Sequence, residues 1–253
     1  MVFSIIVPSF NQESFIANTL KNLTELKQIA FERGIKIEIL LFDAESEAPV
    51  QKIINDFKEG LDYLEIKKDK GQYDAINKGL QKLTGTYWSW LNTDDLIDAK
   101  GFFKLVEILK NENSIDYIYG GVNYMDENGK IINSVSAFPL NVNKLISQQP
   151  AIFQPGSFFK TEFTRKLGLI DSYRCCFDYE FVLRCLKNGA RIHSCNFPVS
   201  AFRYYKQSKT GSITPVFIKE QLIISKLYGR KWYNYLSWFL QLRLLKHFLF
   251  PRK

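Results

Sequence analysis

The chain has 253 residues, of which 46% are hydrophobic, 15% aromatic and 24% charged, and its formal net charge is +8. This composition supplies enough apolar side chains for a buried core, which excludes a disordered, collagen-like or low-complexity protein. The charge is uneven, because residues 1–159 hold 16 basic and 21 acidic residues (net −5), whereas residues 160–253 hold 18 and 5 (net +13). An acidic amino-terminal part opposes binding to phosphate backbones, so we expect no nucleic-acid partner.

Through the first hundred residues, apolar runs of strand length alternate with segments of helical period. The alternation predicts strands at residues 3–7, 37–42, 63–66 and 87–91 and helices at residues 15–23, 50–57 and 75–83. Continuous apolar strands separated by amphipathic helices indicate an α/β fold, with a parallel sheet covered by helices on both faces. In such a sheet, ligands bind at the carboxyl ends of the strands.

After the fourth strand, the regular alternation stops. Asn128 and Gly129 lie between two apolar runs and predict a β-hairpin, because Asn-Gly favours a tight turn. We expect a helix over 99–109, hairpin strands at 117–125 and 131–135, a polar connector over 136–155, a helix over 178–188 ended by Gly189, strands near Ile192 and Phe202, and helices from residue 214 onward.

The four cysteines, Cys175, Cys176, Cys185 and Cys195, lack the spacing and the partner histidines of a zinc site, so we expect free core thiols. The amino-terminal residues lack the features of a secretory signal. No stretch reaches the roughly 18 consecutive apolar residues of a membrane-spanning helix. We therefore expect a cytoplasmic protein without a membrane span.

Polar residues follow every strand expected in the first hundred residues. They are Ser9 and Glu13, then Asp43, then residues 69–77, and finally Asn92, Asp94 and Asp95. Each has a simpler interpretation on its own, since Asp43 and Asp94 could cap helices and Asp69 could form a turn with Gly71. Their recurrence at four strand ends favours a ligand-binding edge of the sheet.

Asp94 and Asp95 directly follow the apolar residues 88–91 and lie at the mouth of a hydrophobic sheet. Two adjacent acids repel each other unless a cation neutralises them. Carboxylate oxygens suit Mn²⁺ or Mg²⁺, and such ions are usually shared with substrate phosphates. We therefore expect a divalent cation together with a diphosphate. Neither a GxxxxGK[ST] loop nor a GxGxxG loop after the first strand offers another phosphate site.

Four segments of the first hundred residues resemble the inverting glycosyltransferases of family 2, which have the GT-A fold. The segments are Ser4 to Asn11, Asp43, Asp69 to Gly79, and Leu91 to Asp95, in the order of the family. Weaker similarity continues to about residue 205. Asn92 replaces the first acid of the family's Asp-x-Asp metal motif, as in an Asn-Ser-Asp-Asp-type branch, and Asp94 is retained.

The resemblance implies a mostly parallel, Rossmann-like sheet and roles for individual residues. The nucleotide and donor site would contain Pro8, Ser9, Glu13, Asp43, Asp69, Gly71, Asp74, Asn77, Lys78, Asn92 and Thr93. Within it, Asp43 would hydrogen-bond the uracil or equivalent base, and Lys78 would reach toward the diphosphate. Asp94 and Asp95 would form the site for Mn²⁺ or Mg²⁺.

The resemblance also implies a general base that takes the proton from the acceptor hydroxyl. Asp178 occupies that position, with Phe177 in place of the usual preceding acid and with Glu180 as the competing candidate. A simpler interpretation of Asp178 is a helix cap, which is compatible with catalysis. The acceptor side would contain Gly156, Ser157, Glu180 and Arg203. Tyr205 stands where the family often has a histidine.

These assignments predict transfer of a sugar from a nucleotide-diphosphate sugar, expected to be a UDP-sugar, to a hydroxyl of a glycan or lipid-linked glycan in cell-surface polysaccharide biosynthesis. Two alternatives stay open. A sugar-nucleotide nucleotidyltransferase would share the acidic metal site, but its glycine-rich, Arg-containing loop is absent after the first strand. A catalytically inactive sugar-nucleotide-binding module would explain the missing first acid of the metal motif.

The expected organisation is a GT-A domain at residues 1–212, with a nucleotide-sugar half at 1–98 and an acceptor half at 99–212, followed by a helical basic tail at 213–253. Residues 219–253 hold 8 basic groups against a single acid, Glu220. Basic and aromatic residues of this kind predict peripheral contact with an anionic membrane, here at the inner face of the cell membrane. The alternative is a terminal helix packed on the domain or on another subunit of a homo-oligomer.

Overall fold

The structure is a computed structural model and describes residues 1–148, 152–205, 215–231 and 242. Its strands are β1 (Val2–Ser9), β2 (Lys36–Asp43), β3 (Tyr63–Ile66), β4 (Tyr87–Trp90), β5 (Leu96–Ile97), β6 (Tyr117–Met125), β7 (Ile131–Val135), β8 (Ser157–Lys160) and β9 (Ile192–Arg203). Its α-helices are α1 (Glu13–Glu32), α2 (Ala48–Asp56), α3 (Gln72–Lys82), α4 (Ala99–Asn111), α5 (Val142–Gln148), α6 (Thr161–Arg165), α7 (Phe177–Lys187) and α8 (Pro215–Leu227). Two 3₁₀ turns, η1 (Lys58–Gly60) and η2 (Gln154–Gly156), complete the described elements.

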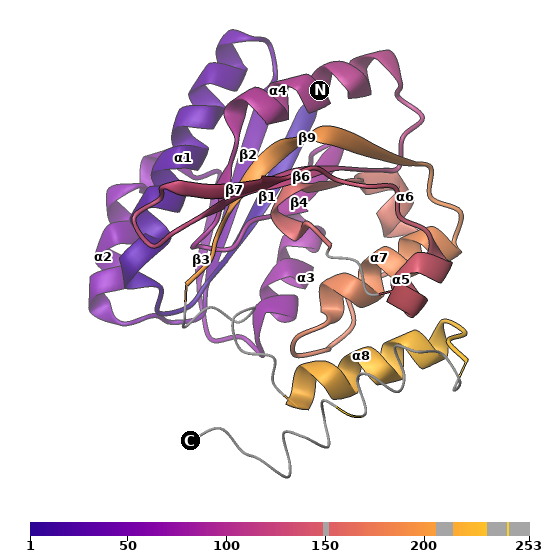
Figure 1. Cartoon of the computed structure of the whole chain (residues 1–253). Coiled ribbons are helices and arrows are strands. Elements are labelled where there is room, and N and C mark those ends of the chain that lie inside the picture. Colours follow the sequence, from indigo (N-terminus) through magenta and orange to yellow (C-terminus); the bar gives the residue numbers. More distant parts are fainter. Residues whose placement is uncertain (149–151, 206–214, 232–241, 243–253) are drawn as a thin grey trace.

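All nine strands belong to one sheet, with the order β3-β2-β1-β4-β8-β6-β9-β5 and with β7 paired to β6 (Figure 1). The first four strands in this order are parallel, and β8 is antiparallel to both β4 and β6. The expected α/β architecture with a mostly parallel sheet is therefore confirmed. The sheet is continuous across residue 98, because β5 pairs with β9 from the second half of the chain.

Two apolar layers cover the sheet, one on each face. The first joins β1 and β2 to α1, α2 and α4, and the second joins the other face to α3, α5, α7 and α8. The central strand β1 is buried at seven of its eight positions, as a parallel strand between two helix layers must be. Trp88 and Trp90 of β4 are both fully buried in the second layer, where their rings stack at 5.7 Å.

The parallel register brings the carboxyl ends of β1, β2 and β3 to one edge of the sheet. Ser9 lies beside Asp43, and Asp43 lies beside Ile66. Because β4 is also parallel to β1, the residues that follow all four strands lie at this edge. This is the edge at which the sequence predicts a ligand.

The chain after β4 differs from expectation in several places. The expected polar connector at 136–155 contains α5 and the start of η2. The two strands expected near Ile192 and Phe202 are one strand, β9, whose pairing with β6 is irregular around Gly121. Neither β5 nor β8 was expected, because two and four residues are too short to give a readable pattern.

The cysteine prediction is confirmed, since all four thiols are free and three of them are buried. In the part of the chain that the structure describes, the helices lack the length and apolar character needed to cross a bilayer. Of the expected helical tail, α8 is described, whereas residues 232–241 and 243–253 lie outside the described residues.

Candidate active site

The carboxyl ends of β1 and β2 meet around a buried carboxylate. The Ser9 hydroxyl donates to Asp43 Oδ2 at 2.8 Å, and the Ser46 hydroxyl donates to the same oxygen at 2.6 Å. The Ser46 backbone N–H donates to Asp43 Oδ1 at 2.7 Å. Asp43 therefore fixes both loops. Beside it, Pro8 is buried at the end of β1, and Glu13 is exposed at the first residue of α1.

The loop between β3 and α3 is ordered by its own polar residues. Gly71 has a φ of 120°, which residues with a Cβ rarely adopt, and its N–H donates to Asp69 Oδ1 at 2.8 Å. Burial raises the pKa of Asp69 above its usual value. In the first turn of α3, Asp74 Oδ2 accepts a hydrogen bond from the Lys70 backbone at 3.2 Å. The loop thus ends at the amino terminus of α3.

Asn77 and Lys78 of α3 both bind protein groups. The Asn77 amide donates to the carbonyl of Ile170 and accepts from its N–H, both at 2.8 Å. The Lys78 ammonium forms an ion pair with Glu65 of β3 at 2.9 Å and contributes most to lowering the pKa of that carboxyl. Asn77 therefore joins α3 to the loop that leads to α7.

Asn92 joins three segments of the chain. Its Oδ1 accepts a short hydrogen bond from Gln72 of α3. Its Nδ2 donates to Asp95 Oδ2 at 3.2 Å and to Gln154 Oε1 at 3.4 Å. Gln154 in turn donates to the carbonyl of Trp90 at 2.6 Å. An aspartate at position 92 would lack these two donated bonds, so the asparagine supports the neighbouring carboxylate rather than repelling it.

The two carboxylates after β4 differ in their surroundings. Asp95 is fully buried, and burial together with neighbouring Asp94 raises its pKa well above the usual range. Asp94 is partly exposed, and Thr93 beside it is buried. A divalent cation of the Mn²⁺ or Mg²⁺ type would relieve the repulsion between two such acids, and Asp94 is the one that such an ion could reach from solvent. Among the described residues, no group of three or more His, Cys, Asp or Glu side chains is placed to hold a metal.

Arg203, at the end of β9, holds the loop that carries these carboxylates. Its backbone N–H donates to Asp95 Oδ1 at 3.1 Å, and its Nε donates to the Asp94 carbonyl at 3.1 Å. Its Nη1 donates to the carbonyls of Asp126 and Glu127 in the β6–β7 turn, at 3.0 and 2.8 Å. The side chain is only 1% exposed. Arg203 thus supports the site from within the protein.

Tyr205 reaches the exposed carboxylate. Its hydroxyl donates to Asp94 Oδ2 at 3.0 Å and accepts from Gln12 Nε2 at 3.1 Å. Its ring packs edge-on against Phe15 of α1, with the ring centroids 5.1 Å apart. Burial and the charge of Asp94 raise the pKa of Tyr205 to about 12, so the phenol stays a hydrogen-bond donor at neutral pH. The segment after β9 therefore contacts the candidate metal ligand directly.

Asp178 lies in the first turn of α7, directly after Phe177. The N-cap residue is Cys176, so the alternative of Asp178 as the helix cap is wrong. Asp178 Oδ1 accepts from the Tyr179 N–H at 2.7 Å, and burial raises the pKa of Asp178 to about 6. The Phe177 ring packs 6.1 Å from the ring of Trp90, the last residue of β4. A carboxylate with this pKa suits a general base at neutral pH.

Both carboxylate oxygens of Glu180 have partners within the protein. It is 3% exposed, its Oε2 pairs with Arg184 at 2.7 Å, and its Oε1 accepts from the Tyr228 hydroxyl at 2.7 Å. Both oxygens therefore have protein donors. This arrangement favours Asp178 over Glu180 as the base.

Gly156 ends η2, Ser157 begins β8, and both are buried. A Cβ on Gly156 would lie 3.1 Å from Ser200 Oγ, and the Ser157 hydroxyl contacts the Tyr117 hydroxyl at 3.0 Å and donates to the Phe153 carbonyl at 3.0 Å. These two residues pack inside the sheet.

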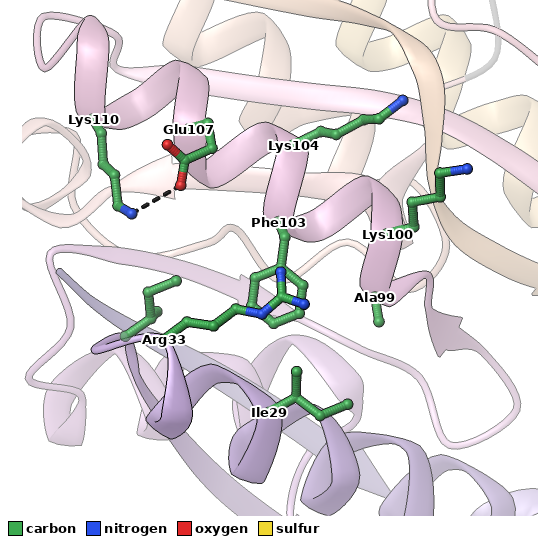
Figure 2. Close-up of a pocket in the computed structure, with 9 residues that line it drawn as sticks. Ile29, Arg33, Ala99, Lys100, Phe103, Lys104, Glu107 and Lys110 are labelled. Carbon is green, nitrogen blue, oxygen red and sulfur yellow. Dashed lines mark hydrogen bonds and ion pairs between the residues drawn. The ribbon is translucent and has the colours of Figure 1, made fainter.

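The larger of two described cavities lies away from these residues. It has a volume of about 490 Å³ and lies between α1 and α4, where the Arg33 guanidinium stacks on Phe103 at 4.0 Å (Figure 2). Ile35, which lines it, directly precedes β2, so this cavity is near the amino ends of the strands. A cavity of about 100 Å³ adjoins the ends of β1 and β2 and is lined by Asn11, Glu13, Glu47, Pro49 and Val50.

Comparison with known proteins decides the family. The model of glycosyl transferase family 2 matches residues 4–181, a range that includes the acidic residues after β4 and Asp178. The chain belongs to glycosyltransferase family 2. It is therefore a transferase enzyme, and the expected family is confirmed.

The similar sequences include proteins named as glycosyltransferases. The PGL/p-HBAD biosynthesis glycosyltransferase of Mycobacterium bovis is 29% identical over 195 residues, which cover 76% of this chain and 72% of that protein. An uncharacterized glycosyltransferase of Methanocaldococcus jannaschii is 20% identical over 198 residues, which cover 75% and 66%.

Solved structures confirm the GT-A fold of this family 2 member. S. aureus TarS 1–349 in complex with UDP-GlcNAc matches with a TM-score of 0.68 and 17% identity, covering 100% of this chain and 74% of that one. The mannosyltransferase PcManGT from Pyrobaculum calidifontis, in complex with GDP-Man and Mn²⁺, matches with a TM-score of 0.63 and 15% identity, covering 100% and 76%.

Proposed function

We propose that this glycosyltransferase moves a sugar from a UDP-sugar to a hydroxyl of a glycan or lipid-linked glycan, with inversion at the anomeric carbon. The observation that carries the proposal is the carboxylate of Asp178, whose pKa burial raises to about 6 and which directly follows Phe177, the residue that packs on Trp90 of β4. Two structural neighbours were solved with the nucleotide sugars UDP-GlcNAc and GDP-Man, which supports a donor of this class.

The loops after β1, β2 and β3 would bind the nucleotide and the donor sugar. The donor-side roles of Pro8, Ser9, Glu13, Asp43, Asp69, Gly71, Asp74, Asn77, Lys78, Asn92 and Thr93 stay predictions. The hydrogen bonds of Asp43 to Ser9 and Ser46 support them, because they keep the β1 and β2 loops in one arrangement. The amino terminus of α3 adds backbone N–H groups and the positive end of a helix dipole, which favour a phosphate.

Asp94 and Asp95 would hold Mn²⁺ or Mg²⁺, with Asp94 as the exposed ligand. A bound divalent cation supplies positive charge that stabilises a leaving diphosphate. The chain keeps both acids in place despite their repulsion, because Arg203 binds the Asp94 carbonyl and Asn92 donates to Asp95. A neighbour solved with Mn²⁺ supports a divalent cation in this fold.

Asp178 would remove the proton from the acceptor hydroxyl while the acceptor oxygen attacks the anomeric carbon. With a pKa of about 6, the carboxylate is mostly ionised at neutral pH and is still basic enough to take a proton. The nucleoside diphosphate would leave from the opposite face of the sugar, and a single displacement of this kind inverts the anomeric centre. Gly156, Ser157 and Glu180 would support the acceptor side, and Arg203 would support the loop of Asp94.

The acceptor is proposed to belong to cell-surface polysaccharide biosynthesis, at the inner face of the cell membrane. The basic residues 219–253 support this, because they would attract anionic lipid. In the described part of this segment, Lys226 is exposed beside Ile223 and Leu227, which are 54% and 71% exposed. Contact of the same segment with another subunit is the alternative.

The test is release of nucleoside diphosphate by the purified protein from a panel of UDP-, GDP- and dTDP-sugars, with Mn²⁺, Mg²⁺ or EDTA. We expect the protein to release UDP from a UDP-sugar. The rate of release should fall at least about tenfold when EDTA removes the metal. Pyrophosphate formed from UTP and a sugar phosphate would instead indicate a nucleotidyltransferase. Binding of a nucleotide sugar without any turnover would indicate an inactive module.

A further inference from the structure

The carboxylate of Glu220 attaches helix α8 to the turn directly before α7, the helix that contains Asp178. Glu220 Oε1 accepts a hydrogen bond from the backbone N–H of Arg174 at 2.7 Å. Its Oε2 accepts from the backbone N–H groups of Cys175 and Cys176 at 2.8 and 3.0 Å. One side chain thus binds three consecutive N–H groups directly before α7, whose second residue is Asp178.

The turn has no cap of its own that could replace Glu220. The N-cap residue of α7, Cys176, makes no side-chain capping hydrogen bond. Backbone N–H groups ahead of a helix need acceptors, and a carboxylate is the strongest acceptor that a side chain offers. Glu220 is also the single acid among residues 219–253, which otherwise carry basic groups. An acid at this position of a basic segment is therefore consistent with a specific role in binding these N–H groups.

Further contacts join α8 to the two sides of Asp178. Before it, the Cys176 thiol donates to the carbonyl of Phe217 at 3.5 Å. After it, Glu180 accepts from the hydroxyl of Tyr228, the residue that follows α8, at 2.7 Å. Figure 1 shows α8 lying alongside α5 and α7. α8 and the residue after it thus contact the chain on both sides of the proposed base.

We propose that Glu220 is a positioning residue for Asp178, so that α8 is part of the catalytic site and not an appended tail. The inference rests on the proposed function, because it assumes that Asp178 is the general base. It places the functional boundary of the domain beyond residue 212.

The charges near Asp178 give the proposal a measurable signature. The charge of Glu220 on α8 acts on Asp178, and the charge of Asp178 acts on the Cys176 thiol in the preceding turn and on the Tyr117 phenol of β6. Burial is the main cause of the raised pKa of Asp178, and the negative charge of Glu220 adds to it. Removing that charge therefore moves the pKa of Asp178 down, which a purely structural contact elsewhere would not do.

The experiment compares E220Q, E220D and the control E162Q in the full chain. E162Q removes an equal charge from an exposed side chain of α6, whose ion pair with Lys166 is open to solvent. Two measurements are made: a ¹³C-carboxyl NMR titration of Asp178, and the pH profile of diphosphate release from the most active UDP-sugar of the panel. Thermal unfolding of each variant is recorded alongside.

For E220Q, we expect the midpoint of the Asp178 titration to fall below the wild-type value near pH 6. The kcat should fall about 10- to 100-fold, because the base is no longer held in place. The KM for the donor should change less than about twofold. E220D keeps the charge, so its midpoint stays near that of the wild type while kcat falls less. E162Q behaves as the wild type.

An unchanged midpoint and kcat in E220Q would overturn the inference, and so would loss of the folded state in both Glu220 variants. Full turnover by D178N would instead refute the assignment of the base. The two failures are distinguishable, because the NMR titration reports on Glu220 and Asp178 without any turnover.

Discussion

Replacement of Asp178 by asparagine is expected to lower kcat/KM for sugar transfer by about 10²- to 10⁴-fold while the protein stays folded. The reason is that asparagine has nearly the same shape but cannot take the acceptor proton. In the wild type, the rate should rise with pH through a midpoint near 6, because the base must be ionised. The rate of D178N should lack this rise with pH. Steady-state kinetics between pH 5 and 8 measure both effects, and a wild-type profile for D178N would exclude Asp178 as the base.

Although D178N is expected to lose activity, it should be more stable than the wild type at neutral pH. Because folding raises the pKa of Asp178 from 3.8 to about 6, the folded state binds more protons than the unfolded state between these pH values. The free energy of unfolding contributed by this group is therefore largest below pH about 4 and falls as the pH rises to 6. D178N removes this dependence and should be more stable than the wild type at pH 7.5 but not at pH 4. Urea unfolding at both pH values is the measurement, and equal differences at the two would contradict it.

Replacement of Asp94 by asparagine is expected to lower metal-dependent transfer by at least about 10³-fold, since a bound cation is worth several kcal/mol to a leaving diphosphate. Asparagine keeps a carbonyl oxygen but loses the charge that attracts the cation. Mn²⁺ binding in the presence of UDP, followed by electron paramagnetic resonance, should weaken in parallel. Any residual activity of D94N should still rise with pH through the midpoint assigned to Asp178.

The control for this variant is D56N, which removes an exposed acid at the end of α2. It should bind Mn²⁺ and transfer sugar as the wild type does. If D94N bound Mn²⁺ with unchanged affinity and kept full activity, Asp94 would not be a metal ligand. If D56N lost as much Mn²⁺ binding as D94N, general negative charge rather than the site would explain the effect.

The first four strands could be predicted from the sequence because they are mostly apolar runs that alternate with helical segments. β1 is buried along nearly its whole length, so periodicity and burial give the same answer. The position of the site followed from the parallel arrangement, which brings the ends of β1 and β2 together at Ser9 and Asp43. The later strands β5 and β8 depend on long-range pairing, which a local pattern does not contain.

The chemistry of single residues was harder to predict than their location. Arg203 was expected on the acceptor side, and it lies buried under the loop of Asp94, because its partners come from segments far apart in the chain. Asn77 binds the backbone of Ile170 for the same reason. Glu220 had one sequence signal, its isolation among basic residues, but its three N–H partners became visible only with the packing of α8 on α7.

The central claim, direct displacement at the anomeric carbon with Asp178 as base, is tested most directly by ¹H NMR of the sugar released when the enzyme hydrolyses its best UDP-sugar. Water then takes the place of the acceptor, and the first-formed anomer is observed before it equilibrates. The proposed mechanism predicts that an α-linked donor gives the β-sugar first, and that D178N gives none at a measurable rate. Initial release of the α-sugar would contradict it.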